Sequence, residues 1–243
     1  MPTISIITAV APDALDHFAD AIASVECQTV PVGWSIEWIV CVDGADMIKL
    51  PFSDTGGRRV QVVCAGRRLG PGGCRNIAAL YAQGTILRNL DADDILLPGA
   101  LQQDIQTLEG HRDLGWTTSE ALDLMPDGSR VTFTTATANR PIPIGYVGRQ
   151  WSRQPILDIH PATLAIRRDV FWSAGGYAAL PMSEDVVLLG RANTVAAGLH
   201  RASPTLLYRK WQGQMTSAPK PAAYERIREL FSGELLRAQQ GGE

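Results

Sequence analysis

The amino-acid sequence predicts an α/β fold with a central, mostly parallel sheet flanked by helices. Short β-branched apolar runs alternate with helical patterns through the first half of the chain, as expected for parallel strands joined by crossover helices. The composition is that of a globular protein, because 45% of the 243 residues are hydrophobic and 19% are charged. This length fits one large α/β domain or two smaller ones.

The first half of the chain carries four predicted strands. Their apolar residues are nearly continuous, as in strands covered on both faces, and they span residues 3–10, 36–42, 60–64 and 85–90. The 3.6-residue spacing of apolar side chains predicts helices over 13–27, over 74–81 and from Pro98 through Leu108. The glycine- and proline-rich stretch 66–73 is expected to be a loop.

The second half has a different pattern. Strands 116–124 and 131–135 are expected to form a hairpin around the turn 125–129. Prolines and glycines in 139–148 predict a mobile loop, and we expect 139–153 to close over a bound ligand. The remaining predicted elements are a strand at 162–166, helices at 168–174 and 186–197, a strand at 206–211 and an amphipathic terminal helix at 222–239.

Composition excludes several classes of protein. Lys and Arg number 22 and Asp and Glu number 25, so the net charge is −3 and no nucleic-acid partner is expected. No apolar run reaches the roughly 18 residues that span a bilayer, so no integral membrane segment is expected, and 1–10 is interpreted as a buried strand rather than a signal peptide. Four widely spaced cysteines without a C-x-x-C pair favour reduced thiols in a cytoplasmic protein.

Chemistry-bearing residues follow the predicted strands. Ligands of open α/β sheets bind at the carboxyl ends of the strands, and Asp43, the stretch 70–76 and Asp91-Ala92-Asp93-Asp94 all fall there. Strand alternation places Asp91 and Asp93 on one side, where two carboxylates suit Mg²⁺ or Mn²⁺ and a bound diphosphate. Each signal has a structural alternative: a turn at Asp43, a plain loop at 70–73, and a helix N-cap cluster at 91–94.

Other candidates are weaker. His160 precedes a strand that could border an acceptor cleft, or it is structural. Arg149 and Arg153 could meet a phosphate or an acidic acceptor, or form a solvated face. The tryptophans are either core residues or platforms for a sugar ring, and the candidates for stacking are Trp151, Trp172 and Trp211. The terminal helix mixes acidic and basic residues and is expected to dock on its own domain.

Six segments, in order, together resemble family 2 glycosyltransferases with the GT-A fold. They cover about residues 3–217 and comprise Val42-Asp-Gly44, Gly70-Pro-Gly-Gly-Cys-Arg-Asn76, Asp91-Ala-Asp-Asp94 with Pro98, Arg167-Arg168 through Gly175-Gly-Tyr177, Ser183-Glu-Asp185, and Tyr208-Arg209 with Gly213-Gln-Met-Thr216. The resemblance implies a Rossmann-like GT-A domain with a nucleotide-sugar-binding half at 1–110 and a smaller acceptor-side, catalytic-base half at 111–217, followed by a C-terminal helix at 218–243.

The resemblance also implies roles for individual residues. Asp185 would be the catalytic base, and Asp93 would bind a divalent metal, Mn²⁺ or Mg²⁺. The donor nucleotide would be bound by Thr8, Ala9, Asp43, Arg75, Asp91 and Ala92, with Asp43 at the nucleobase and Asp91 at the ribose or sugar. Glu184, His160 and Trp211 would either contact the acceptor or contact and orient the residues that bind the substrates.

The function that follows is metal-assisted, inverting transfer of a sugar. The donor would be UDP-, GDP- or dTDP-linked, the acceptor a small molecule or glycan with a hydroxyl or amine, and the protein could be a homodimer. Two departures from the family pattern, Val42 for its first Asp and Trp211 for its His, slightly favour the alternative of a nucleotide-sugar-binding module without transfer. The presence of Asp91, Asp93 and Asp185 argues against that alternative. A nucleotidyltransferase is a third reading, but it would need a glycine-rich turn that 8–12 lacks.

Overall fold

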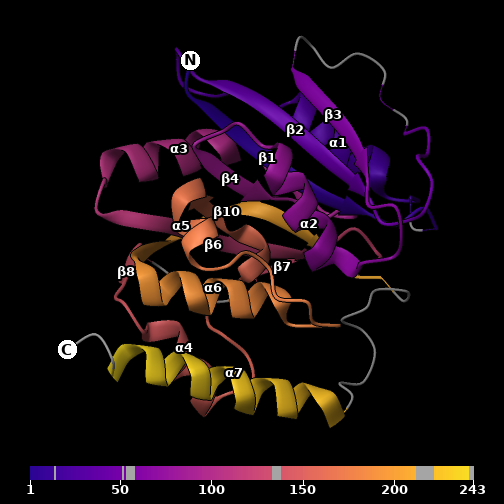
Figure 1. Ribbon diagram of the computed structural model, residues 1–243. Helices are drawn as coiled ribbons and strands as arrows, with labels where there is room; N and C mark the ends of the chain where they lie inside the picture. The colour runs from indigo at the N-terminus through magenta and orange to yellow at the C-terminus, as the bar shows by residue number, and fades with distance from the viewer. Residues whose placement is uncertain (14, 51, 53–57, 133–137, 212–221, 241–243) are drawn as a thin grey trace.

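The computed structural model describes residues 1–13, 15–50, 52, 58–132, 138–211 and 222–240. One ten-stranded sheet runs through the molecule with helices on both faces (Figure 1). The strands are β1 (Thr3–Val10), β2 (Ser35–Val42), β3 (Arg59–Cys64), β4 (Ile86–Asn89), β5 (Ile95–Leu96), β6 (Leu114–Leu124), β7 (Arg130–Thr132), β8 (Arg140–Ile142), β9 (Ala165–Arg167) and β10 (Ala197–Arg209).

The sheet has the order β3-β2-β1-β4-β9-β6-β10-β5, with β7 paired to β6 and β8 paired to β10. Strands β3, β2, β1 and β4 are parallel, and β6 is parallel to β10. Short β9 runs against both β4 and β6, so the two parallel groups point in the same direction. The predicted mixed, mostly parallel α/β sheet is confirmed.

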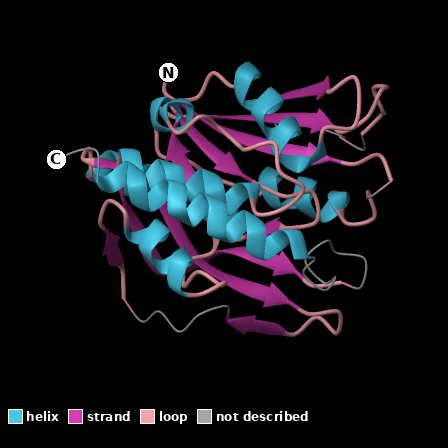
Figure 2. Cartoon of the chain, turned by 60° about the horizontal axis from the view of Figure 1, so that its bottom comes forward, coloured by secondary structure: helices cyan, strands magenta, loops and turns pink. Residues whose placement is uncertain are grey.

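Two helical layers cover the sheet. One face carries α1 (Phe18–Glu26) and α3 (Ala100–Gly110), whose apolar residues pack on the strands with Trp38. The other face carries α2 (Gly70–Tyr81), α4 (Tyr146–Arg153), α5 (Arg168–Ser173), α6 (Glu184–Val195) and α7 (Ala222–Gln240). Ala162 of the 3₁₀ helix η1 (Pro161–Thr163) belongs to the core of the first face. Figure 2 shows the helix beside the C-terminus in front of the sheet, with a second helix alongside it.

The terminal helix α7 docks on the molecule itself, as expected. Leu235 is 1% exposed and belongs to the core between the sheet and the helices. A Cβ atom on Gly148 of α4 would lie 2.9 Å from the Leu235 Cβ atom, and one on Gly190 of α6 would also collide with Leu235. Small residues on two helices therefore let α7 approach closely. In the described part of the chain, no helix is long and apolar enough to cross a membrane.

Two predicted elements of the second half are corrected by the structure. The stretch 139–148 is not a loop, because β8 pairs with β10 and α4 buries Val147 and Trp151. Pro141 is tolerated because β8 lies at an edge of the pairing, and Gly145 begins α4 with a φ of +79°. The predicted strand at 206–211 is the end of the longer β10. Residues 133–135 of the hairpin and 213–216 of the last motif lie outside the described residues.

Helix starts also differ from the sequence prediction. The expected loop at 70–73 is the first turn of α2, which begins at Gly70 with a φ of +75°. Pro71 fits there because the first N–H groups of a helix have no partner within the helix. Helix α1 begins at Phe18 rather than at Asp13, and α6 begins at Glu184 rather than at Val186. The last shift places Glu184 and Asp185 in the first turn of α6.

Candidate active site

Charged side chains meet around Arg75 of α2. Its Nη1 atom donates to Glu184 Oε1 over 2.9 Å, and its Nη2 atom donates to Asp91 Oδ1 over 2.5 Å. The guanidinium carbon lies 5.3 Å from the centroid of the Tyr177 ring, and the residue is 6% exposed. Burial alone would lower the pKa of Arg75, but the charge of Asp91 and the other acidic groups holds it well above its usual range. Arg75 is therefore a fixed cation inside the site.

Asn76 ties α2 to the turn before α6. Its Nδ2 atom donates to the Tyr177 carbonyl over 2.9 Å, and its Oδ1 atom accepts the Tyr177 N–H over 2.8 Å. Gly176 has a φ of +65°, and a Cβ atom there would lie 2.7 Å from Asn76 Oδ1. Similarly, a Cβ atom on Gly72 would lie 2.8 Å from the Glu184 Cγ atom. Three segments singled out in the sequence therefore pack directly against one another.

Asp185 stands in the first turn of α6, after Ser183 with its left-handed φ of 60°. Its Oδ1 atom accepts the Val186 N–H over 2.8 Å. Burial first, and then the neighbouring charge of Glu184, raise the pKa of Asp185 to about 7. A carboxylate with a pKa near neutrality can accept a proton during a reaction and release it afterwards. Asp185 therefore combines a partly exposed position with a pKa near neutrality.

Asp43 holds the start of α2. One carboxylate oxygen, Oδ1, accepts the Leu69 N–H over 2.6 Å, and the other, Oδ2, accepts the Gly70 N–H over 3.2 Å. A negative charge there is favourable because the first N–H groups of a helix carry partial positive charge. The structure thus gives Asp43 a role in the glycine-rich turn, in addition to the nucleobase contact that the sequence suggests.

Thr8 and Ala9 lie at the carboxyl end of β1, as predicted. The Thr8 side chain is fully buried, and its Oγ1 atom accepts the Trp38 indole N–H over 2.9 Å. Ala9 is partly buried and packs against the core on the opposite face. The Thr8 hydroxyl is therefore occupied within the protein, and a nucleoside at this edge would meet the strand end rather than that hydroxyl.

Asp93 is joined to the end of β10. The Trp211 indole N–H donates to Asp93 Oδ2 over 2.9 Å, and Arg209 Nε donates to the Asp93 carbonyl over 2.8 Å. Burial first, and then the charge of Asp91, raise the pKa of Asp93. The His17 ring lies beside this junction and packs edge-on against the Trp211 ring, with 5.6 Å between the ring centroids.

The carboxylates of Asp91 and Asp93 are suited to a divalent cation that has only a few ligands from the protein. Asp91 and Asp93 carry carboxylate oxygens of the kind that hard divalent cations prefer. The pKa of Asp93 is raised by burial first and by the charge of Asp91 second, and a cation would offset the second of these causes. Among the described residues, no group of three His, Cys, Asp or Glu side chains is arranged to hold a metal. A cation here would therefore take its other ligands from a bound diphosphate and water.

His160 directly precedes the 3₁₀ helix at 161–163 and lies within reach of the charge of Asp91. It is 8% exposed, its Nδ1 atom accepts the Ala162 N–H over 3.3 Å, and its ring packs 4.7 Å from that of Tyr208. Burial first, and then the positive charge of Lys210, lower the pKa of His160 to about 4. The imidazole is therefore neutral near pH 7 and can serve as a hydrogen-bonding group rather than a cation.

The remaining candidate residues differ in their exposure to solvent and in their contacts. Trp151 is 1% exposed and is a core residue of α4, whereas Trp172 is 40% exposed on α5. Arg149 donates to Gln239 Oε1 over 2.9 Å and so helps to fix α7, and Arg153 is exposed at the end of α4. Neither Arg149 nor Arg153 belongs to the cluster of charged side chains around Arg75.

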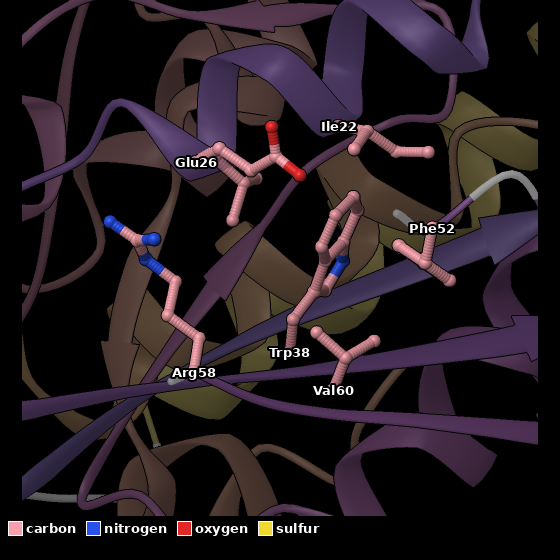
Figure 3. Close-up of a pocket in the computed structure, with 7 residues that line it drawn as sticks. Ile22, Glu26, Trp38, Phe52, Arg58 and Val60 are labelled. Carbon is pink, nitrogen blue, oxygen red and sulfur yellow. The ribbon is translucent and has the colours of Figure 1, made fainter. Parts of the chain in front are cut away.

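A small cavity lies away from this cluster, between α1 and strands β2 and β3. Figure 3 shows Trp38 and Val60 of the strands facing Ile22 of α1, with Phe52 beside them. Its volume of ≈ 10 Å³ is room for about one water molecule. The cavity is thus an imperfection of core packing rather than a substrate site.

Sequence reasoning left several residues of the site without a role. Tyr208 and Arg209 belong to a motif in the sequence, but the motif does not indicate that the Tyr208 ring packs against His160 or that Arg209 Nε donates to the Asp93 carbonyl. Tyr177, under Arg75, was likewise only part of a motif. His17 carried no signal, because its neighbour Trp211 is almost two hundred residues away in the chain.

Comparisons with known proteins bear on the family and the fold of this chain. The family model of glycosyl transferase family 2 matches residues 36–175. S. aureus TarS 1-349 in complex with UDP-GlcNAc has a TM-score of 0.70 at 15% identity, covering 98% of this chain and 70% of that one. S. aureus TarS 1-349 has a TM-score of 0.64 at 16% identity, covering 86% of this chain and 60% of that one. No match was found among curated proteins.

Proposed function

This chain belongs to glycosyl transferase family 2, and from its site we propose that it transfers a sugar from a nucleotide-sugar donor to a hydroxyl or amine of an acceptor. One observation carries the proposal: Asp185, whose pKa is raised to about 7, lies beside the Arg75 bridge that leads to Asp91 at the end of β4. A base and a donor-side carboxylate thus share one charged cluster.

The donor would bind across the carboxyl ends of β1, β2 and β4. The fold of the TarS complex with UDP-GlcNAc supports a nucleoside diphosphate sugar, and UDP is the first nucleotide to test. Asp43 would serve the nucleobase both through its carboxylate and through the α2 turn that it holds. Asp91 with Ala92 would face the ribose or the sugar, beside the strand end at Thr8 and Ala9.

Asp93 would hold a divalent cation, Mn²⁺ or Mg²⁺, with Asp91 as the neighbouring carboxylate. When bound, the cation would stabilise the negative charge of the departing nucleoside diphosphate. Trp211 keeps one Asp93 oxygen oriented through its indole N–H.

Asp185 would carry the chemical step. The acceptor oxygen or nitrogen forms a bond to the anomeric carbon while the bond from that carbon to the diphosphate oxygen breaks. The acceptor proton passes to Asp185, and the electron pair of the broken bond leaves with the nucleoside diphosphate. A single displacement of this kind inverts the anomeric configuration. Neutral His160, whose ring packs at a tilt against that of Tyr208, would contribute a hydrogen bond on the acceptor side.

A second candidate function is a binding module that does not transfer the sugar. Trp211 occupies Asp93 Oδ2, and the described residues offer no three-ligand metal cluster. Such a module would bind nucleotide sugars without releasing nucleoside diphosphate.

One experiment separates the two. A panel of UDP-, GDP- and dTDP-sugars is incubated with the protein and candidate acceptors, with Mn²⁺ or with EDTA, and released nucleoside diphosphate is measured. Asp185→Asn is the matched control, because it keeps the size of the side chain and removes its basicity. If the parent protein releases nucleoside diphosphate and Asp185→Asn does not, the result supports the transferase. Binding without turnover favours the module, and binding of none of these sugars contradicts both.

A further inference from the structure

Arg75 is too enclosed to be a simple substrate ligand. It is 6% exposed, and two of its three guanidinium nitrogens already donate to carboxylates of the protein. The face of the group is covered by the Tyr177 ring at 5.3 Å. The third nitrogen, Nε, is buried without a hydrogen-bond partner among the described residues. These contacts point to a role within the protein.

Glu184 is equally enclosed. It is 6% exposed, its Oε1 atom accepts from Arg75 over 2.9 Å, and its Cγ atom fills the space that the missing side chain of Gly72 leaves. A carboxylate held in this way is poorly placed to orient an acceptor. It fixes the first residue of α6, and the next residue along the chain is Asp185.

The two halves of the proposed site meet in this bridge. Asp91 follows β4, and Glu184 begins α6, so the carboxylates come from segments that are far apart in the sequence. Arg75 is the side chain that contacts both, at 2.5 Å and 2.9 Å. The two hydrogen bonds between the Asn76 side chain and the Tyr177 backbone hold the same stretch of α2 against the turn before α6.

We propose that Arg75 is a positioning residue, which joins Glu184 to Asp91 and thereby sets the place and the electrostatic surroundings of Asp185 without contacting donor or acceptor. The proposal deepens the proposed function, because it rests on Asp185 as the base. It differs from the role that the family resemblance suggests, in which Arg75 lies against the nucleotide.

The charges that face Asp185 make the proposal testable. They come from Glu184 on α6 itself, Arg75 on α2, Asp91 after β4, and the Tyr177 hydroxyl in the preceding turn. Glu184 and Asp91 raise the pKa of Asp185, whereas Arg75 lowers it. Replacing Arg75 and replacing Glu184 should therefore move the pKa in opposite directions.

The first test needs no substrate. The pKa of Asp185 is measured by ¹³C-carboxyl NMR titration of the full chain, with the Asp185→Asn spectrum assigning the signal. We expect Arg75→Met to raise the pKa and Glu184→Gln to lower it, each by on the order of one unit. Arg75→Lys keeps the charge and should leave the pKa close to that of the parent. Shifts in the same direction, or no shift in either variant, would overturn the proposal.

The second test separates positioning from nucleotide binding. UDP affinity is measured by calorimetry, and kcat is measured with the donor and acceptor found active. We expect Arg75→Lys and Glu184→Gln to bind UDP about as tightly as the parent while kcat falls, because displacement of a base by about 1 Å can lower a rate by on the order of 10²-fold. If Arg75→Lys loses UDP affinity and Glu184→Gln does not, Arg75 is a nucleotide ligand and the proposal is wrong.

Two further outcomes concern a variant that fails to fold and a parent protein that binds no nucleotide. If Arg75→Met gives no cooperative thermal transition, the charge-conserving Arg75→Lys and the nearly isosteric Glu184→Gln carry both tests. In that case the downward pKa shift in Glu184→Gln, against an unchanged pKa in Arg75→Lys, is the required result. A parent protein that binds no nucleotide contradicts the proposed function and leaves the NMR test of the bridge intact.

Discussion

The indole N–H of Trp211 donates to Asp93 Oδ2 over 2.9 Å, which joins the end of β10 to the turn after β4. Arg209 strengthens the same junction, since its backbone N–H donates to Asp94 Oδ1 over 2.9 Å. The two adjacent aspartates therefore have different surroundings. Asp93 is partly exposed at the site, whereas Asp94 is fully buried behind it.

This difference predicts opposite phenotypes for the two aspartates. Asp93→Ala should abolish the Mn²⁺-dependent part of UDP affinity with little change in melting temperature. Asp94→Ala should lower stability by about 1–3 kcal/mol, because it leaves the partly buried Arg209 N–H without its partner. Calorimetry with Mn²⁺ or EDTA, and thermal unfolding, give both measurements. Unchanged Mn²⁺-dependent affinity in Asp93→Ala would remove Asp93 from the metal site.

Asp185→Asn should lose turnover and keep donor binding. A general base contributes on the order of 10²–10⁴-fold to a rate, so kcat should fall by that factor while the Kd for the donor stays near that of the parent. In the parent, kcat should rise with pH around a midpoint near 7, because the pKa of Asp185 is raised to about 7 and the base must be ionised. Normal turnover in Asp185→Asn would place the base elsewhere.

Asp185 should also make stability depend on pH. Burial first, and then the charge of Glu184, raise the pKa of Asp185 from 3.8 to about 7 in the folded protein. Its contribution to stability is fully present below about pH 4 and is lost as the pH rises through 7, because the unfolded chain ionises first. Relative to the parent, Asp185→Asn should therefore gain free energy of unfolding across this window, by up to about 1.4 kcal/mol per pH unit. Urea unfolding at pH 4 and pH 8 measures the difference, which should not be the same at both.

Asn76→Ala should loosen the turn before α6. It removes both hydrogen bonds to the Tyr177 backbone, and a partly buried N–H and C=O left unpaired cost about 1–3 kcal/mol. We expect lower stability in urea and a lower kcat with UDP affinity retained. Asn76→Asp is the matched control, since it keeps the acceptor for the Tyr177 N–H and loses only the donor. Equal stability of parent and Asn76→Ala would show that the turn holds without this contact.

Asp43→Ala should weaken the binding of free nucleoside diphosphate and of its sugar conjugate by the same factor. The change acts on the nucleobase side and on the start of α2, where loss of the accepting carboxylate also costs about 1 kcal/mol of stability. Calorimetry with UDP and UDP-GlcNAc compares the two. If the sugar conjugate alone lost affinity, Asp43 would act on the sugar instead.

The sequence predicted the long strands well because their burial is a local property of composition. β1 has the predicted bounds, β2 and β3 begin one residue before the predicted start, and β4 is one residue shorter than predicted at each end. It failed at 139–153, where Pro141 and Gly145 indicate a loop, because the partners that order this stretch are β10 and α7. Pairing with His200, and the packing of Gly148 against Leu235, cannot be seen within a local window.

The site was predicted in parts rather than as a whole. Periodicity and motif spacing placed Asp43, Asp91 and Asp93 at one edge, since parallel strands end together. The bridge from Arg75 to Glu184 spans 109 positions of the chain and could not be predicted from either residue. The one sequence feature near Arg75 that relates to this bridge is Gly72, whose lack of a side chain makes room for Glu184.

The placement of β9 affects how the protein could be assembled or recombined. β9 belongs to the second half of the sequence, yet it fills the position between β4 and β6. During synthesis, β4 must therefore wait for residues 165–167 before its outer edge is paired. A chimera that exchanges the second half of the chain after residue 110 would import a foreign strand into the middle of the ten-stranded sheet, beside β4. Successful exchange of acceptor specificity would have to keep β9 and move only the segments on either side of it.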